Sequence, residues 1–497
     1  MKSILYIRLP CRKIYPAGPV YLADYVHKHF PTVDQKILDL SLVKEDEEKK
    51  VLLKVIDEFN PEALAFSWRD IQPFSPDEDD PALKNSFKFY YSPKVGEKIR
   101  ASFQGLKMIL FYENRIRKNL SLVNLAKRTF PKKKVLIGGP AFSVFGRTLI
   151  KKCPEDTLGI IGEGENVFLK IIGGKDVLDE RVVLKKDGEI LWGTPLKKSS
   201  KKWSYVPLEK STPVDFDYIT SIFPDFEEYI QDFVGVPTKR GCPFKCLFCL
   251  YPHIDGKQVR YRPPEVVAKD VEALNRNFGV KKIWFCDSQF FPASKSLPIA
   301  EQTLDELIKR KLDVQWTSYI RIDQITPVIA KKMLLSGVGD FELSITSGAQ
   351  TVIDRLRLGF KLDRFFEACQ ALKDAGHTNQ KLRLNLSLNA PGETRETILE
   401  TVNSVKKISA IFGEENVRPF LFFLAVQPQT GLAEHAVKEG YLPDNFNPLA
   451  LNPFIIRNLI YNPAPLGKVI GRAMNQAMKN GTEIGWQVLK KLEEKLK

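Results

Sequence analysis

Three cysteines follow one another closely near the middle of the chain: Cys242, Cys246 and Cys249, with the spacing C-x3-C-x2-C. Cysteine thiolates are the usual ligands of iron–sulfur clusters. Three of them on a four-iron cube leave one iron open to a substrate or cofactor. Zinc is the competing metal, but a structural zinc site normally closes with four ligands, and the nearest further ligand in sequence is His253. Phe248, just before the last cysteine, offers an aromatic ring to cover the cluster or stack on an adenine.

The cysteine motif with its preceding aromatic residue resembles the signature of the radical S-adenosylmethionine (SAM) superfamily. The resemblance implies a [4Fe-4S] cluster whose open iron binds the amino and carboxylate groups of SAM. A structural zinc site and three unconnected core cysteines remain the alternatives.

The composition sets broad bounds on what the protein is. The 497 residues suggest about three domains, and 43% of them are hydrophobic, enough for ordinary cores. No apolar run approaches the ~20 residues of a membrane span, and the first residues enter a strand pattern rather than a signal peptide. We therefore expect a cytoplasmic protein, in which the four scattered cysteines are free thiols.

The formal net charge is +15, which is compatible with a nucleic-acid partner. The lysines are dispersed in pairs and triplets, however, such as Lys132-Lys133-Lys134. This pattern favours solvated faces, so we expect a small-molecule substrate rather than a nucleic acid.

The first part of the chain alternates short apolar runs with helical patterns, which predicts an α/β fold with a parallel, doubly wound sheet. Ligands of such sheets bind at the carboxyl ends of the strands. The turns after the fourth and fifth strands are rich in glycine, which permits close approach of the backbone to a ligand. The five predicted strands are 3–9, 36–42, 63–68, 134–137 and 158–161, and a hairpin follows at 182–192 around Asp187-Gly188.

A doubly wound domain before the cysteine motif resembles the Rossmann-like domain of cobalamin-dependent radical SAM enzymes. Three short segments carry the resemblance: Pro16-Ala17-Gly18-Pro19, Gly138-Gly139-Pro140 and Gly162-Glu163-Gly164-Glu165. The alternative is a Rossmann-type domain that serves only as a scaffold. The resemblance implies a cobalamin site in residues 1–197, with contacts from Tyr21, Ser67, Gly138, Gly139, Pro140, Gly162 and Glu163.

The loop after the first strand, residues 10–15, contains no histidine. Many cobalamin proteins place a histidine below cobalt, so the resemblance implies a cofactor without that ligand here. Arg69 follows the third strand and could face the same side of the corrin. A guanidinium is permanently charged and a very poor metal ligand, so it would keep a lower ligand away and tune cobalt reactivity. The alternative is an ion pair of Arg69 with Asp70 or with the acidic loop at 74–81.

Two segments interrupt this pattern. Residues 69–133 are too long for a single crossover helix, and we expect an ordered insertion over the ligand edge of the sheet. A serine–lysine stretch opens the segment 198–233, which we interpret as a linker.

Residues 234–431 resume the strand–helix alternation and predict a partial (β/α)6 barrel, the fold that the resemblance implies. Functional residues belong at the carboxyl ends of barrel strands. The candidates are Asp287 and Gln289 near the methionine end of SAM, Arg321 for its carboxylate, Ser347 for its ribose, Gly392 beside its adenine, and Tyr319 as a proton acceptor. Each could instead be a satisfied polar group of the barrel rim.

Residues 432–497 read as a helical region that closes the open barrel. The resemblance as a whole implies a methyltransferase that moves a methyl group from SAM via methylcobalamin to a carbon atom. It would work as a monomer with an electron donor such as flavodoxin or ferredoxin. The missing histidine, Arg69, and Thr346 where relatives commonly have glutamate make the chain similar to the tryptophan C2-methyltransferase of thiostrepton biosynthesis, with an indole substrate. A cobalamin-dependent cyclase or rearrangement enzyme, a tRNA-modifying radical SAM enzyme and a non-catalytic cobalamin carrier remain alternatives.

Overall fold

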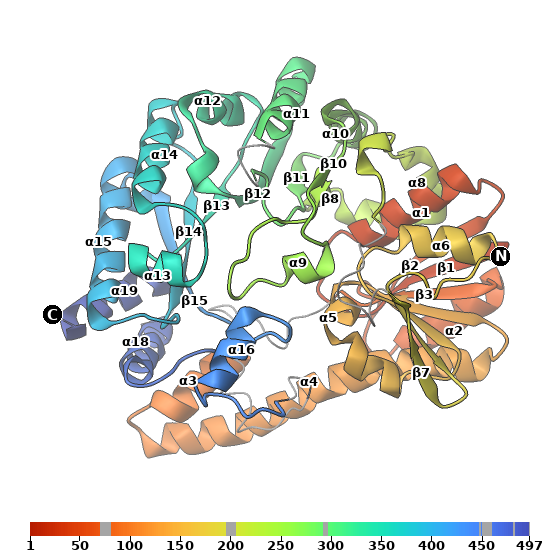
Figure 1. Cartoon of the computed structure of the whole chain (residues 1–497), viewed down its shortest axis with the longest axis horizontal. Helices are drawn as coiled ribbons and strands as arrows, with labels where there is room; N and C mark the ends of the chain where they lie inside the picture. The colour runs from red at the N-terminus through yellow and green to blue at the C-terminus, as the bar shows by residue number, and fades with distance from the viewer. Residues whose placement is uncertain are drawn as a thin grey trace.

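The computed structural model describes residues 1–69, 81–194, 205–291, 297–446, 449, 460–480 and 483–496. Two sheets organise the chain, one in an N-terminal domain and one in a half-open barrel (Figure 1). The predicted acidic loop at 74–81 lies outside the described residues except for Pro81, which begins a helix.

The N-terminal sheet has seven strands in the order β2-β1-β3-β4-β5-β6-β7. The first five are parallel, as predicted, and the last two form the antiparallel hairpin. Asp187 and Gly188 form its turn, both with positive φ, as the strand twist of a two-residue hairpin requires. The strands are β1 Ser3–Arg8, β2 Asp34–Asp39, β3 Ala63–Ser67, β4 Lys134–Gly138, β5 Thr157–Ile160, β6 Val182–Lys186 and β7 Glu189–Trp192.

Both faces of this sheet are covered because its strands are apolar on both sides. Ile4 and Tyr6 of β1 belong to one core, and Leu5 and Ile7 belong to a second core on the opposite face. Helices α1 (Ala17–His29), α6 (Glu165–Ile172) and α8 (Phe216–Ile222) contribute to the first core. Helices α2 (Glu48–Phe59), α4 (Val95–Thr129) and α5 (Pro140–Leu149) contribute to the second.

The insertion after β3 forms α3 (Pro81–Tyr91) and α4, a helix of 35 residues. The last turns of α4 pack on the second face of the N-terminal sheet through Leu120, Val123 and Ala126. The rest of α4 runs along the bottom of Figure 1, and α3 lies beside the C-terminal helices. The Phe87 ring lies 5.4 Å from that of Phe423 on the last barrel strand, and Asn462 Nδ2 donates to the Tyr91 hydroxyl at 3.0 Å. The insertion therefore joins the two domains.

The segment 198–233 differs from the expected linker wherever the structure describes it. Residues 205–233 contain α8 and the short helix η4 (Pro224–Tyr229). Phe223 and Tyr229 are fully buried, and the Tyr229 hydroxyl donates to Asp39 at 2.6 Å. Burial of these aromatic side chains gives the segment a fixed path, which its polar opening did not indicate.

The second sheet has six parallel strands in the order β15-β14-β13-β12-β11-β8. Within the described residues β8 and β15 are not paired with each other, so the barrel is open. The strands are β8 Val234–Val236, β11 Lys282–Phe285, β12 Gln315–Ile320, β13 Phe341–Thr346, β14 Leu382–Leu388 and β15 Val417–Phe423. The helices that follow them are α10 Pro264–Phe278, α11 Leu297–Arg310, α12 Pro327–Leu335, α13 Gln350–Arg355, α14 Leu362–Asp374, α15 Arg395–Phe412 and α16 Gly431–Lys438.

Two C-terminal helices, α18 (Leu466–Asn480) and α19 (Ile484–Leu496), pack beside the β15 end of the open barrel. Trp486 of α19 donates its indole N–H to the carbonyl of Val417 at 3.0 Å. The two helices thus cover the β15 end, and the closing of the barrel by the helical tail stays a prediction.

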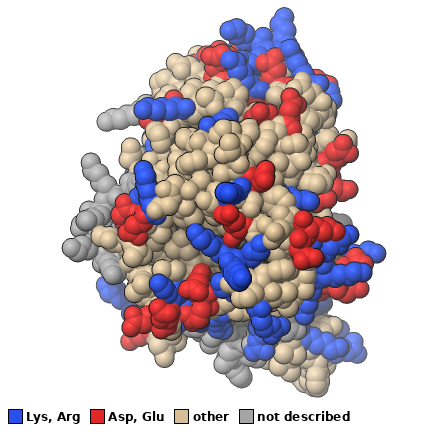
Figure 2. All heavy atoms as spheres, turned by 90° about the vertical axis from the view of Figure 1, so that its right-hand side faces the viewer, with Lys and Arg blue, Asp and Glu red and all other residues tan. Residues whose placement is uncertain are grey.

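On the surface shown in Figure 2, lysine and arginine side chains alternate with aspartate and glutamate rather than forming one basic patch. Among the helices of the described ranges, none combines the length and apolar composition needed to cross a bilayer.

Candidate active site

The cysteine loop is closed at its base by a small antiparallel ladder. Strand β9 (Lys239–Arg240) pairs with β10 (Arg260–Tyr261), and Cys242 N donates to the carbonyl of Gly256 at 3.0 Å. Gly241 has φ +84°, and a Cβ there would lie 2.0 Å from the carbonyl oxygen of Gln258. Only glycine fits this approach, so the residue before the first cysteine fixes the direction in which the loop leaves the barrel.

All three cysteines line one cavity of about 530 Å³ between the cysteine loop and the inner wall of the barrel. Among the described residues, no three His, Cys, Asp or Glu side chains converge closely enough to hold a single metal ion. A four-iron cube binds each thiolate to a different iron, so it needs the cysteines around one cavity rather than at one point. Burial raises the pKa of Cys246 to about 11 and that of Cys249 to about 12, so these thiols lose their protons only when a positive metal is present.

Two of the predicted residues lie near the cysteines, and a third does not. Phe248 and Gln289 line the cavity, and Gln289 Nε2 lies 3.7 Å from the Cys242 sulfur. Asp287 does not line it. Its buried carboxylate accepts from the backbone of Thr238 at 2.9 Å and of Lys239 at 3.2 Å, so it positions the start of the cysteine loop.

Two candidates of the barrel rim, Ser347 and Gly392, lie outside the cavity lining. Ser347 is fully buried away from the cavity, with its hydroxyl 3.2 Å from that of Thr401, whereas Ser344 and Thr346 line the cavity. The cause is the period of two along β13, because residues 342, 344 and 346 share the inner face. Gly392 has φ +82° and contacts Arg355 outside the cavity lining.

Arg321 lines the cavity, but most of its guanidinium is already engaged by other groups of the protein. The guanidinium is paired with Asp323, with Nε 2.7 Å from Oδ1, and donates to the carbonyls of Leu358 and Gly359 at 2.8 Å. It also stacks on Phe244 at 3.9 Å. This geometry favours a role in holding the loop at 358–359 against the cysteine loop. The predicted contact with the SAM carboxylate stays a prediction.

Tyr319 faces the same cavity, with its ring edge-on to Trp284 at 5.1 Å. Burial raises the pKa of its hydroxyl, and the carboxylate of Glu342 raises it further. The positive charges of Arg383, Arg69 and Arg12 oppose that shift. Arg12 and Arg69 belong to the N-terminal domain, so Tyr319 marks the place where the two domains face each other.

Eight residues that line the cavity were not among the residues predicted from the sequence. Those residues are Arg12, Phe244, Tyr251, Glu342, Arg383, Asn385, Phe420 and Phe422. The signal that could have found them is the alternation of polar or aromatic residues on the inner faces of β13, β14 and β15. Glu342, Arg383, Asn385, Phe420 and Phe422 lie inside these strands rather than at their carboxyl ends, and Arg12, Phe244 and Tyr251 lie outside the strands.

A second cavity, of about 250 Å³, lies at the carboxyl edge of the N-terminal sheet. Gly139 has φ +94°, and a Cβ there would lie 2.6 Å from the carbonyl oxygen of Trp68. From this edge the cavity continues between the sheet and α1 to the apolar side chains of Tyr6, Leu136 and Phe168. Six residues predicted to bind a cofactor line it: Ser67, Gly138, Gly139, Pro140, Gly162 and Glu163.

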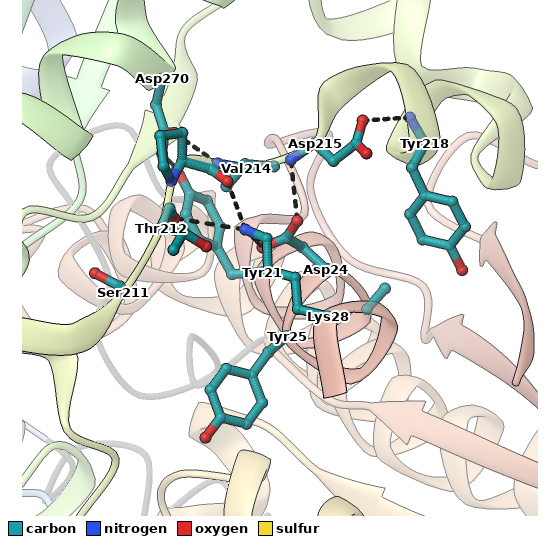
Figure 3. A network of polar contacts seen from close by, with 12 residues as sticks. Tyr21, Asp24, Tyr25, Lys28, Ser211, Thr212, Val214, Asp215, Tyr218 and Asp270 are labelled. Atoms are coloured by element: carbon teal, nitrogen blue, oxygen red, sulfur yellow. Dashed lines mark hydrogen bonds and ion pairs between the residues drawn. The ribbon is translucent and has the colours of Figure 1, made fainter. Parts of the chain in front are cut away.

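Tyr21 and Arg69 lie elsewhere. The Tyr21 hydroxyl donates to Asp270 at 3.2 Å, within the polar network of α1, α10 and the segment 211–215 (Figure 3). In that network Val214 N donates to Asp270 at 2.8 Å and Asp215 N donates to Asp24 at 3.0 Å. Arg69 is exposed directly after β3 and lines neither cavity, although its charge acts on Tyr319.

A buried group of ion pairs connects the two cavities. Glu163 pairs with Arg260 through both carboxylate oxygens, and Glu165 pairs with Arg240. The two glutamates lie in the glycine turn after β5, and the two arginines lie in the ladder that carries the cysteine loop. Both pairs are less than a quarter exposed at every side chain. The glycine turn and the cysteine loop are thus held together directly.

Comparison with known proteins supports this arrangement. Residues 236–405 match the model of the radical SAM superfamily. The chain is 26% identical to the uncharacterized methyltransferase PH0819 of Pyrococcus horikoshii over 320 aligned residues. The alignment covers 62% of this chain and 64% of that protein. Matches to two further curated relatives cover 50% and 52% of their lengths.

Two solved structures are similar over most of the chain. The methyltransferase TsrM from Kitasatospora setae, with tryptophan and a SAM analogue bound, has a TM-score of 0.64 at 16% identity, covering 88% of this chain and 76% of that one. The cobalamin-dependent enzyme OxsB, with aqua-cobalamin and SAM bound, has a TM-score of 0.64 at 12% identity, covering 96% and 66%. Residues 236–405 therefore match the radical SAM domain, and the chain as a whole shares the fold of TsrM and OxsB.

Proposed function

We propose that the protein is a cobalamin-dependent radical SAM methyltransferase that transfers a methyl group from SAM to a carbon atom of a small molecule. The observation that carries the proposal is the pair of cavities held together at the domain junction, one lined by three cysteines and the other by glycine turns. When bound, the cluster supplies electrons and a site for SAM, and cobalamin supplies a carrier for the methyl group.

The residues of the chain fit both cofactors. Cys242, Cys246 and Cys249 would hold three irons of the cluster, and Phe248 lies beside them to exclude water. At the other cavity, Gly139 and Gly162 give the backbone close access to a flat ring, and the apolar slot behind them suits the tail of cobalamin. The cofactor would have no histidine from the loop at 10–15, which contains none.

We also propose that the methyl acceptor is an electron-rich ring such as an indole, for example that of tryptophan. The cavity offers aromatic walls in Phe420, Phe422 and Tyr319. Tyr319 would accept the proton of a ring nitrogen. Its raised pKa keeps the phenol neutral at rest, so three nearby arginines would have to favour the phenolate when substrate fills the cavity. An external donor such as flavodoxin or ferredoxin would keep the cofactors reduced, with the enzyme acting as a monomer.

The test is anaerobic purification with iron, sulfide and cobalamin, followed by incubation with SAM that carries a deuterated methyl group. We expect one cluster and one cobalamin per chain in the absorption spectrum, and release of S-adenosylhomocysteine. Failure to retain cobalamin, or cleavage of SAM to 5′-deoxyadenosine alone, would reject the methyltransferase. Transfer of the deuterated methyl group to tryptophan would support the indole assignment, and its absence with turnover of SAM would reject that assignment only.

A further inference from the structure

A cluster of charged and polar side chains lies on the inner wall of the barrel, separate from the ion pairs at the domain junction. Glu342 on β13 pairs with Arg383 on β14, Nη1 to Oε1 at 3.4 Å. The same glutamate accepts from Asn385 Nδ2 at 3.0 Å. All three side chains line the cavity that holds the cysteines.

The guanidinium of Arg383 is held in one orientation, while some of its N–H donors remain available to a ligand. Its guanidinium lies 3.8 Å above the Phe420 ring, and one edge faces Glu342. Within the described part of the chain it has no other ion-pair partner, and its side chain is 43% exposed, into the cavity. Stacking and pairing fix the plane of the five N–H donors before a ligand arrives, and such preorganisation strengthens recognition of a carboxylate.

Asn385 supplies a second, independent sign of a ligand. The residue is only 9% exposed, and its Oδ1 has no hydrogen-bond partner among the described residues. The amide nitrogen donates to the Glu342 carboxylate, so the oxygen must be the free end. A buried acceptor without a donor is costly, and a ligand N–H or ammonium group in the cavity would remove that cost. Arg383 and Asn385 lie two residues apart on one face of the strand, ~6.6 Å along it.

The charge of the cavity wall also favours an anion. Glu342 is matched by Arg383, and Arg321 is matched by Asp323 outside the lining. The remaining charged residue of the lining is Arg12, which has no ion-pair partner among the residues that the structure describes. Apart from the three cysteines, which become thiolates when they hold the cluster, the wall thus carries one positive charge that no side chain of the lining matches.

We propose that the substrate carries a carboxylate bound by Arg383 and, next to it, an N–H or ammonium group bound by Asn385. This inference rests on the proposed methyl transfer and names the class of its acceptor, an acid with a nearby hydrogen-bond donor. Arg383 is then a specificity-determining residue, with Phe420 and Glu342 as the residues that position it.

The experiment measures binding of matched acids and amides to the anaerobic protein loaded with cluster and cobalamin. The probes are indole-3-acetate with indole-3-acetamide, and phenylacetate with phenylacetamide, titrated by calorimetry. We expect at least one acid to bind the parent protein about tenfold or more tightly than its amide. Arg383→Gln should abolish that preference. Arg383→Lys, which keeps the charge but loses the planar fork, should keep part of it.

Arg364→Gln is the matched control, because Arg364 pairs with Glu367 on the exposed face of α14, and it should bind all probes like the parent. Equal binding of acid and amide by the parent, no binding of either acid, or an unchanged preference in Arg383→Gln overturns the proposal. SAM affinity is measured in the same samples. Loss of SAM affinity in Arg383→Gln with the acid preference intact would assign Arg383 to SAM and overturn it too.

The two proposals fail in different ways. An acid preference that depends on Arg383, in a protein that never forms S-adenosylhomocysteine, would support the carboxylate site and reject methyl transfer. Formation of S-adenosylhomocysteine without any acid preference would do the opposite.

Discussion

Substitution of Glu163 by glutamine should loosen the junction between the two cofactor cavities. Glu163 is 9% exposed and Arg260 is 6% exposed at their side chains. The carboxylate accepts from Arg260 Nη1 at 3.1 Å, from Nη2, and from the backbone N–H of Val206 at 3.1 Å. Once the negative charge of Glu163 is gone, the partners of the Arg260 guanidinium are all neutral: the carbonyls of Val206 and Asp255, the face of Tyr205 and the glutamine oxygen.

Removing one partner of a buried ion pair costs ~3–5 kcal/mol, because the other charge stays buried without compensation. Glutamine still offers one acceptor oxygen, so we expect about 3 kcal/mol. The control is Glu265→Gln, which breaks an exposed pair with Lys269 on α10. An exposed pair of this kind contributes ~0.5 kcal/mol or less.

Hydrogen exchange of the protein without cofactors measures this effect locally, because the Val206 amide is itself a donor to Glu163. A loss of about 3 kcal/mol in local opening corresponds to ~150-fold faster exchange in the peptide that contains Val206. Glu265→Gln should leave that peptide unchanged. Adding Arg260→Gln to Glu163→Gln should recover part of the protection, since neither charge is then left alone. Exchange within threefold of the control in Glu163→Gln would show that the buried pair does not hold the junction.

Alanine in place of any one of the three cluster cysteines should remove most iron and sulfide and all turnover, while Cys286→Ala keeps the metal; iron analysis that shows full content in all three would contradict the ligand assignment. Electron paramagnetic resonance of the reduced, cobalamin-loaded protein should show no nitrogen splitting from an axial imidazole, and such a splitting would disprove a histidine-free cofactor. Arg69→Lys should retain part of the S-adenosylhomocysteine release and Arg69→Leu should lose most of it, both with normal cobalamin content; parent-like release in the leucine variant would reduce Arg69 to a structural role. Burial raises the pKa of Asp255 to about 6 against the charges of Arg240 and Lys239, so its protonated form stabilises the fold at low pH and that contribution is lost as pH rises through 6. Asp255→Asn should therefore raise the thermal midpoint above that of the parent at pH 8 but not at pH 4. A variant with the same midpoint as the parent at both pH values would refute the raised pKa of Asp255.

The sheets could be predicted from the sequence because their strands are continuous apolar runs between amphipathic helices. Strand β3, predicted at 63–68, is Ala63–Ser67, and the glycine turns at 138–140 and 162–164 line the cavity that the resemblance implied. These features depend on local periodicity and on glycines that can adopt positive φ, and short stretches of sequence are enough to indicate both.

The rest depended on information that no short stretch contains. Ser347 was predicted because it follows the strand, yet the pleat of β13 turns it away from the cavity that Ser344 and Thr346 line. Arg383 and Asn385 were not among the predicted residues because they lie inside β14 rather than at its carboxyl end, and only the folded barrel shows that they line the cavity with the cysteines. The positions of α3 and α4, and with them the contacts of Phe87 and Tyr91 on α3, depend on tertiary packing alone.

The helical arm formed by α3 and α4 also limits how the protein can fold. Phe87 and Tyr91 are encoded in the first fifth of the chain, but they pack on Phe423, Asn462 and the backbone of Gly471 near its end. The N-terminal sheet can form as soon as β7 has been synthesised, whereas this arm cannot be buried until α18 has left the ribosome. A fragment ending at residue 197 would therefore expose the aromatic face of α3 that carries Phe87 and Tyr91. Expression of the two domains as separate pieces should give material that aggregates unless both are made together.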